Sequence, residues 1–225
     1  MKNIHPLVNI FEAYQNQKTA QKQSAYMRNQ FAFYGIVTPL RKKLQQPFLK
    51  KDALPSKEAL TPIIQTLWQQ PKREVHYFAM DLLRKYSKVY ELEDIALFEQ
   101  MITTHSWWDT VDIIAPNMVG DYLKQYPKEK ELCVERWLAS ENIWLQRTAI
   151  LFQLRYKEAL DRELLTHVIT ELQGSKEFFV NKAIGWILRE YGKTNPQWVL
   201  EFIENNELHP LSRCEGLRVL KSKKG

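Results

Sequence analysis

The stretch Leu82-Leu83-Arg84-Lys85-Tyr86 has a close counterpart far along the chain, Ile187-Leu188-Arg189-Glu190-Tyr191. Leu154-Arg155-Tyr156 matches the end of both stretches, and Tyr122 closes a comparable segment between them. The four tyrosines are separated by 36, 34 and 35 residues. A spacing near 35 residues is typical of stacked helix pairs, in which each repeat buries its apolar face against its neighbours.

Other features of the chain also favour helices. Nearly every segment has its apolar residues at the 3.6-residue period of a helix, while strand-like alternation and Asn-Gly or Asp-Gly hairpin signals are missing. Pro39, Pro71 and Pro196 stand where helices should begin. The tetratricopeptide pattern Trp-x2-Leu-Gly-x2-Tyr is absent, so HEAT-like repeats of irregular length fit better. We therefore predict an all-α fold, a single domain over residues 1–225, built as a superhelical solenoid of antiparallel HEAT-like helix pairs with a concave face.

The composition excludes several classes of protein. The chain has seven glycines and no Gly-x-Gly turn, which argues against the phosphate-binding loops of Rossmann and P-loop proteins. Cys133 and Cys214 form no CxxC motif, and the five histidines are scattered, so we expect a reduced compartment and no metal. Glu12 interrupts any signal-peptide core, and no apolar run approaches the roughly 20 residues that span a bilayer. The expected protein is soluble and cytoplasmic.

The charge pattern points to a nucleic-acid partner. The formal net charge is +6 and the isoelectric point is about 9.1, which is compatible with such a partner without requiring one. One predicted helix has a basic face that also carries Trp186 and lies opposite an apolar stripe. This face is either an ordinary solvated surface or a surface where cations meet phosphates and the Trp packs on sugar or base. Its cations are Lys182, Arg189 and Lys193, and the stripe is Val180, Ile184, Ile187, Leu188 and Tyr191.

A second pattern places an aromatic ring beside a carboxylate. Residues 106–112 read Ser-Trp-Trp-Asp-Thr-Val-Asp, so Trp108 and Asp112 are four residues apart and share one face of a helix. An aromatic π-face and a carboxylate both attract cations. The alternative is a core tryptophan and a structural aspartate. Pro116 predicts a kink or break just beyond this segment.

Arg147 is the only charged residue between Ile143 and Leu154. A buried guanidinium needs a carboxylate partner or a ligand anion, because leaving it unpaired is very costly. The partner is either Asp109 or Asp112, in a structural salt bridge, or a phosphate, which the forked donors of arginine suit well.

The repeat register predicts that several of these residues line one surface. Asp112 lies ten residues before Tyr122, and Arg147 lies nine before Tyr156. Lys182 and His76 stand at similar distances before Tyr191 and Tyr86. Equivalent positions of stacked repeats form a continuous surface, usually the concave one.

At these residues the chain resembles the AlkD-like DNA alkylation-repair glycosylases, a family with HEAT-like repeats. The resemblance implies that the catalytic aspartate is Asp112, that Trp108 and Trp186 are cleft tryptophans, and that Arg147 is an essential arginine. Tyr26 matches a further cleft residue that contacts DNA. The matching strings extend over most of the chain: Ser24-Ala25-Tyr26-Met27-Arg28, Ser106-Trp107-Trp108-Asp109, Asn142-Ile143-Trp144-Leu145-Gln146-Arg147, Ala183-Ile184-Gly185-Trp186 and Asn205-Asn206-Glu207-Leu208.

The resemblance also implies an activity. Such an enzyme excises cationic N3- and N7-alkylated purines, such as 3-methyladenine and 7-methylguanine, from duplex DNA bound on the concave face. It is a monofunctional glycosylase that hydrolyses the N-glycosidic bond and begins base excision repair, without metal or cofactor. We expect a monomer in the cytoplasm, associated with the nucleoid in a bacterium. The alternative is an inactive HEAT-like scaffold for DNA or protein, which would have no use for the carboxylate of Asp112.

Overall fold

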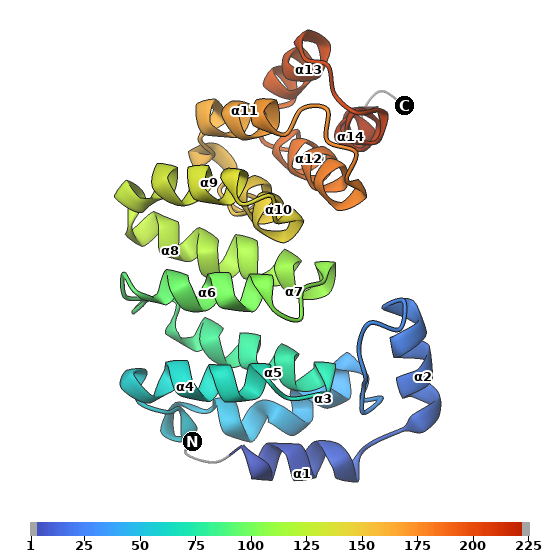
Figure 1. Cartoon of the computed structure of the whole chain (residues 1–225), viewed down its shortest axis with the longest axis vertical. Coiled ribbons are helices and arrows are strands. Elements are labelled where there is room, and N and C mark those ends of the chain that lie inside the picture. The colour runs from blue at the N-terminus through green and yellow to red at the C-terminus, as the bar shows by residue number, and fades with distance from the viewer. Residues whose placement is uncertain (1–3, 222–225) are drawn as a thin grey trace. The chain divides into compact units, whose positions relative to one another are not determined.

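The computed structural model describes residues 4–221, and the regular secondary structure of this part of the chain is helical (Figure 1). No strand forms over these residues; a single β-bridge joins Ala32 to Lys72. The all-α prediction is confirmed, and helix pairs stack on one another as in an α solenoid. The chain divides into two compact units, residues 1–89 and 90–225, which are described separately below.

The N-terminal unit begins with helices that flank a long loop over residues 27–37. Its α-helices are α1 (His5–Ala13), α2 (Gln17–Tyr26), α3 (Thr38–Gln45), α4 (Lys57–Trp68) and α5 (Arg73–Leu83). Short 3₁₀ segments, η1 (Gln46–Leu49), η2 (Lys51–Ala53) and η3 (Arg84–Tyr86), follow α3 and α5. Helix α2 has no fully buried residue, and its Gln23 and Ser24 side chains donate to the carbonyls of Ile36 and Phe31 in the loop that follows it.

One buried carboxylate fixes the long loop of this unit. The Glu74 carboxylate accepts hydrogen bonds from the backbone N–H groups of Tyr34, Gly35 and Ile36, at 2.9–3.1 Å. Gly35 has a φ of +89° and lies so close to Asn16 that an added Cβ would stand 2.0 Å from its carbonyl oxygen. Only glycine fits both constraints, so the loop has a defined path between α2 and α5.

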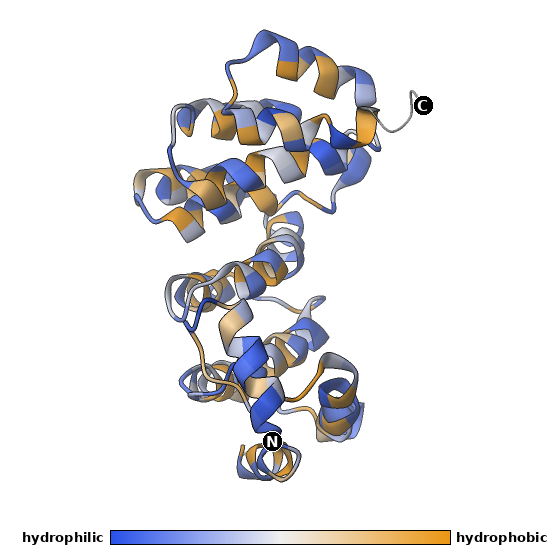
Figure 2. Cartoon of the chain, turned by 90° about the vertical axis from the view of Figure 1, so that its right-hand side faces the viewer, coloured by the Kyte–Doolittle hydropathy of each residue, from blue (hydrophilic) through white to orange (hydrophobic). Residues whose placement is uncertain are grey.

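The C-terminal unit contains the remaining helices. They are α6 (Asp94–Thr103), α7 (Trp108–Ile113), the π-helical η4 (Ile114–Val119), α8 (Gly120–Gln125), α9 (Lys130–Ala139), α10 (Ile143–Leu151), α11 (Arg162–Glu171), α12 (Phe178–Tyr191), α13 (Pro196–Asn205), α14 (Pro210–Gly216) and α15 (Arg218–Lys221). The 3₁₀ turns η5 (Pro127–Glu129) and η6 (Lys157–Ala159) lie between them. Apolar and polar residues alternate around most of these helices, as hydropathy colouring shows (Figure 2).

Three of the tyrosines that define the sequence repeat bond to backbone carbonyls about one repeat length earlier in the chain. Tyr86 donates its hydroxyl hydrogen to the carbonyl of Pro55, 31 residues earlier. Tyr122 donates to Leu92 at 2.9 Å, and Tyr156 to Gly120 at 2.7 Å. Pro55 and Leu92 lie in the loops just before α4 and α6, whereas Gly120 is the first residue of α8. The predicted period therefore corresponds to a recurring bond from a tyrosine hydroxyl to a backbone carbonyl 30–36 residues earlier. Tyr191 differs, since its ring packs edge-on against that of Trp198, with centroids 5.5 Å apart.

Prolines start helices largely as predicted. Pro39 lies in the first turn of α3, and Pro196 is the first residue of α13, where the Asn195 side chain caps the helix by accepting from the N–H of Trp198. Pro71 precedes α5 by two residues. Pro116 does not break its helix; it lies in η4, so α7, η4 and α8 form one continuous helix with a widened turn.

Candidate functional site

The site begins with a short helix that carries one half-buried carboxylate, Asp112. Trp107 is extended, with φ −162° and ψ 162°, and α7 starts at the next residue. Trp108 is in the first position of α7 and Asp112 is one turn later; both are half-buried. The preceding turn is fixed by Ser106, whose hydroxyl donates to the carbonyl of Ile102 at 2.7 Å.

Arg147 reaches this carboxylate from the neighbouring helix α10. Asn142 caps α10 by accepting hydrogen bonds from the N–H groups of Trp144 and Leu145. From the second turn of that helix, Arg147 donates through Nε to Asp112 Oδ1 at 2.7 Å and through Nη2 to Asp112 Oδ2 at 2.9 Å. Its Nη1 donates to the backbone carbonyl of Phe179. All three guanidinium nitrogens of Arg147 therefore donate hydrogen bonds to acceptors within the protein.

Burial is unequal across this ion pair. The Arg147 side chain is 4% exposed, whereas the Asp112 side chain is 18% exposed. Burial raises the pKa of the Asp112 carboxyl above its ordinary value, and the hydrogen bond and charge of Arg147 oppose that rise. The carboxylate is thus the member of the pair that faces solvent, with the arginine behind it.

Aromatic rings pack around the arginine's third partner. The rings of Trp107, Trp144 and Phe179 form a triangle with centroid distances of 4.9–5.7 Å. Phe178 lies edge-on to Phe179 at 5.4 Å and is 55% exposed. Sequence reasoning missed this cluster, although adjacent aromatic pairs at 107–108 and 178–179 are a visible signal of it.

The basic face predicted on α12 is not an open row of cations. Lys182 and Arg189 each donate to the carboxylate of Glu215 on α14, both at 2.6 Å. Lys193 pairs with Glu190 at 2.6 Å. Helix α14 packs across this face, which the sequence predicted to be open either to solvent or to nucleic acid.

Trp186 and the apolar stripe behind it behave differently from these cations. Trp186 is half-buried on α12, between Lys182 and Arg189 in sequence. The opposite stripe of this helix is buried as predicted.

The hydrogen bond from Lys182 lowers the pKa of the Glu215 carboxyl. Glu215 therefore stays ionised between its two partners, Lys182 and Arg189.

The remaining predicted residues lie in the N-terminal unit. Tyr26 is the last residue of α2 and is 71% exposed. His76 is buried on α5, with Nε2 2.9 Å from the carbonyl oxygen of Gln70 and its ring 4.8 Å from that of Trp68. It takes part in the packing of its own unit. Among the predicted site residues, the structure thus brings Asp112 and Arg147 into direct contact.

Metal-binding clusters and membrane-spanning helices are both absent from residues 4–221. Over residues 4–221, no group of three or more His, Cys, Asp or Glu side chains is arranged to hold a metal ion. None of the helices described there is long and apolar enough to cross a bilayer.

Comparison with known proteins places this chain in a family. The family model of the DNA alkylation repair enzyme matches residues 7–220, so the chain belongs to that family. It also resembles the solved structure of a predicted DNA alkylation repair enzyme from Enterococcus faecalis, with a TM-score of 0.85 and 37% identity. That match covers 92% of this chain and 96% of the other. No curated protein sequence matches the chain.

Proposed function

We propose that this protein is a DNA glycosylase that excises cationic N3- and N7-alkylated purines from duplex DNA by hydrolysing the N-glycosidic bond. Membership of the DNA alkylation repair enzyme family supports a role in the repair of alkylation damage. The single observation that carries the finer proposal is the Asp112–Arg147 pair, in which a buried arginine holds a solvent-facing carboxylate in one orientation.

Excision of a cationic purine requires only one catalytic carboxylate. Alkylation at N3 or N7 makes the purine cationic, so the base leaves without being protonated and no general acid is needed. The remaining task is to stabilise the oxocarbenium-like sugar that forms as the bond breaks. A carboxylate about 4 Å from that charge, at an effective dielectric of about 20, contributes roughly 4 kcal/mol, which corresponds to about a thousandfold in rate. Asp112 performs this role and orients the attacking water.

The other residues hold the sugar and the carboxylate. Trp108 and Trp186 bind the cationic deoxyribose through their π-faces. Arg147 acts as a positioning residue, because its donors are bonded to Asp112 and Phe179 rather than left for a phosphate. Tyr26, which is exposed on the N-terminal unit, contacts the DNA. We expect the protein to act as a cytoplasmic monomer and to need no cofactor.

The experiment incubates purified protein with methylated duplex DNA and follows free 7-methylguanine and 3-methyladenine by mass spectrometry. We expect release by the wild type and a loss of about a thousandfold with Asp112→Asn, which removes the charge and keeps an acceptor for Arg147. Asp121→Asn, a carboxylate change on α8 outside the pair, should retain activity. No release by the wild type despite tight binding to DNA would favour an inactive scaffold, and release by Asp112→Asn at the wild-type rate would refute the role of the carboxylate.

A further inference from the structure

The positive charge of this protein is concentrated in its N-terminal unit. Residues 1–89 contain 15 Lys and Arg against 5 Asp and Glu, a formal charge of +10. Residues 90–225 contain 17 against 21, a formal charge of −4. Residues 13–51 contain eight cations and no acidic residue at all. The net charge of +6 therefore conceals a strongly basic unit and an acidic one, and such asymmetry favours a polyanion at the basic unit.

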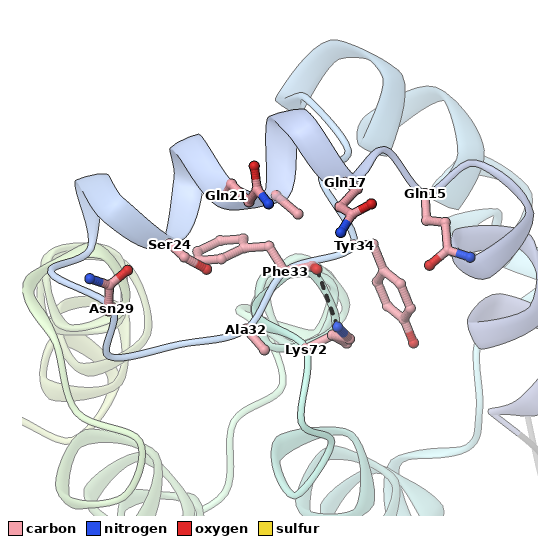
Figure 3. A pocket seen from close by; sticks show the side chains of 10 residues that line it. Gln15, Gln17, Gln21, Ser24, Asn29, Ala32, Phe33, Tyr34 and Lys72 are labelled. Atoms are coloured by element: carbon pink, nitrogen blue, oxygen red, sulfur yellow. Dashed lines mark hydrogen bonds between the residues drawn. The ribbon is translucent and has the colours of Figure 1, made fainter.

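Two grooves of the N-terminal unit differ in their chemistry. The larger, of about 770 Å³, lies beside α2 and is lined mainly by amide and hydroxyl side chains (Figure 3). Lys72 is its one cationic lining residue, and its Nζ donates to the carbonyl of Phe33 at 3.3 Å. The smaller groove, of about 510 Å³, lies between α3 and the end of α5. Four cations line it: Lys42, Lys50, Arg84 and Lys85.

The single carboxylate in the smaller groove is already neutralised. Asp81 Oδ2 accepts from Arg41 Nη1 at 3.0 Å and from Gln45 Nε2 at 2.6 Å. Arg41 is buried, with its side chain 8% exposed, and also donates to Gln45 at 2.7 Å. This network joins α3 to α5, and two of its members, Gln45 and Asp81, line the groove. The charge that the groove presents to solvent is therefore that of its four cations.

Those four cations are available to a ligand. All of them are exposed, and none has a carboxylate partner among the described residues. Lys42 lies in the last turn of α3, and Arg84 and Lys85 follow the last turn of α5. Because the carbonyl ends of both helices stabilise nearby cations, the unit can hold this cluster at little cost to folding.

We propose that this groove binds the phosphodiester backbone of duplex DNA. The proposal rests on the proposed function for the identity of its ligand, and it deepens that function by assigning the phosphate contacts to the N-terminal unit. Lysine and arginine that contact phosphates release condensed counterions, so such a groove supplies affinity without sequence preference. The cations of α12, which are paired with Glu215 and Glu190, contribute little to it.

The test measures binding of unmodified duplex DNA by fluorescence anisotropy as a function of salt. Two variants each remove two groove cations, Lys42→Gln/Lys50→Gln and Arg84→Gln/Lys85→Gln. The matched control, Lys128→Gln/Arg162→Gln, removes two exposed cations of the C-terminal unit. Each groove variant should reduce the slope of log K against log salt by about 1.8, or about 0.9 for each phosphate that is no longer neutralised, while the control keeps the wild-type slope.

Several results would overturn the proposal. Equal losses in the control and groove variants would mean that only net charge matters. Tighter binding of a single-stranded RNA of the same length, lost in both groove variants, would assign the groove to RNA instead. Because the DNA carries no lesion, the result does not depend on catalysis. A wild-type protein that shows the expected groove dependence but releases no alkylpurine supports the groove and contradicts the glycosylase activity.

Discussion

Arg147 shows how far a single residue can be interpreted from its sequence context. An isolated cation in an apolar helix predicts a buried guanidinium with an anionic partner, and the structure confirms the burial and supplies the partner. The sequence could not choose among Asp109, Asp112 and a phosphate, because the partner lies 35 residues away on another helix. The two parallel bonds to Asp112 resolve that choice and suggest a positioning role.

A substitution at Arg147 tests whether this residue orients the Asp112 carboxylate or neutralises a DNA phosphate. Arg147→Lys keeps the charge but loses the fork that fixes both carboxylate oxygens. We expect the single-turnover rate of alkylpurine release to fall about 100-fold, since small misplacements of a catalytic group have effects of that size. The affinity for unmodified duplex and its salt slope should not change, because the side chain is buried.

The control for this experiment lies on the same segment of chain. Arg155 is exposed and donates to the side chain of Asn117, so Arg155→Lys should keep the wild-type rate. In Arg147→Gln, which removes the charge, a salt slope lowered by about 0.9 would show that Arg147 neutralises a phosphate and would contradict the positioning role.

Helices α7 and α12 show where periodicity predicts an element well and where it does not. The kink expected at Pro116 appears as a π-helical turn, because proline has no N–H to donate to the carbonyl of Asp112 four residues earlier. Asn117 restores one bond by donating its side-chain amide to Ile113 at 2.7 Å. The buried stripe of α12 was predictable from spacing. The docking of α14 was not, since Glu215 lies 33 residues beyond Lys182.

The close approach of α12 and α14 depends on one glycine. A Cβ added at Gly185 would lie 2.5 Å from the Cβ of Glu215 and 3.0 Å from the carbonyl oxygen of Ser212. Gly185→Ala should therefore push the helices apart and lower the free energy of unfolding by about 1–3 kcal/mol, measured as a shift in the urea midpoint.

Gly192 provides the comparison for this change. It follows the same helix, has an ordinary φ of −63°, and an added Cβ there would have its nearest neighbour at 3.3 Å. Gly192→Ala should change the stability by less than about 1 kcal/mol. If Gly185→Ala were as stable as the wild type, the tight packing at this glycine would not be what holds α14 in place.

Across the described residues, the repeat was the most predictable feature and the pairing of charged side chains the least. The tyrosine spacing of 34–36 residues was visible in the sequence because each tyrosine occupies a recurring position, as the hydrogen bonds of Tyr86, Tyr122 and Tyr156 show. The basic face on α12 appeared equally regular, yet its cations are paired within the protein. Ion pairs between distant segments are not encoded in local periodicity. Only the structure therefore shows that the four groove cations, Lys42, Lys50, Arg84 and Lys85, have no carboxylate partner among the described residues.

This distribution of charge predicts that salt affects binding and not the chemical step. If the four groove cations each contact one phosphate, they contribute about −3.6 to the slope of log K against log salt, so raising salt from about 50 to about 200 mM should lower the excision rate at subsaturating protein by roughly 100-fold. The rate at saturating protein should change little, because Asp112 and Arg147 form a largely buried neutral pair that salt screens weakly. Single-turnover measurements at both protein concentrations test this directly. A parallel loss at saturation would mean that exposed charges act in the chemical step itself.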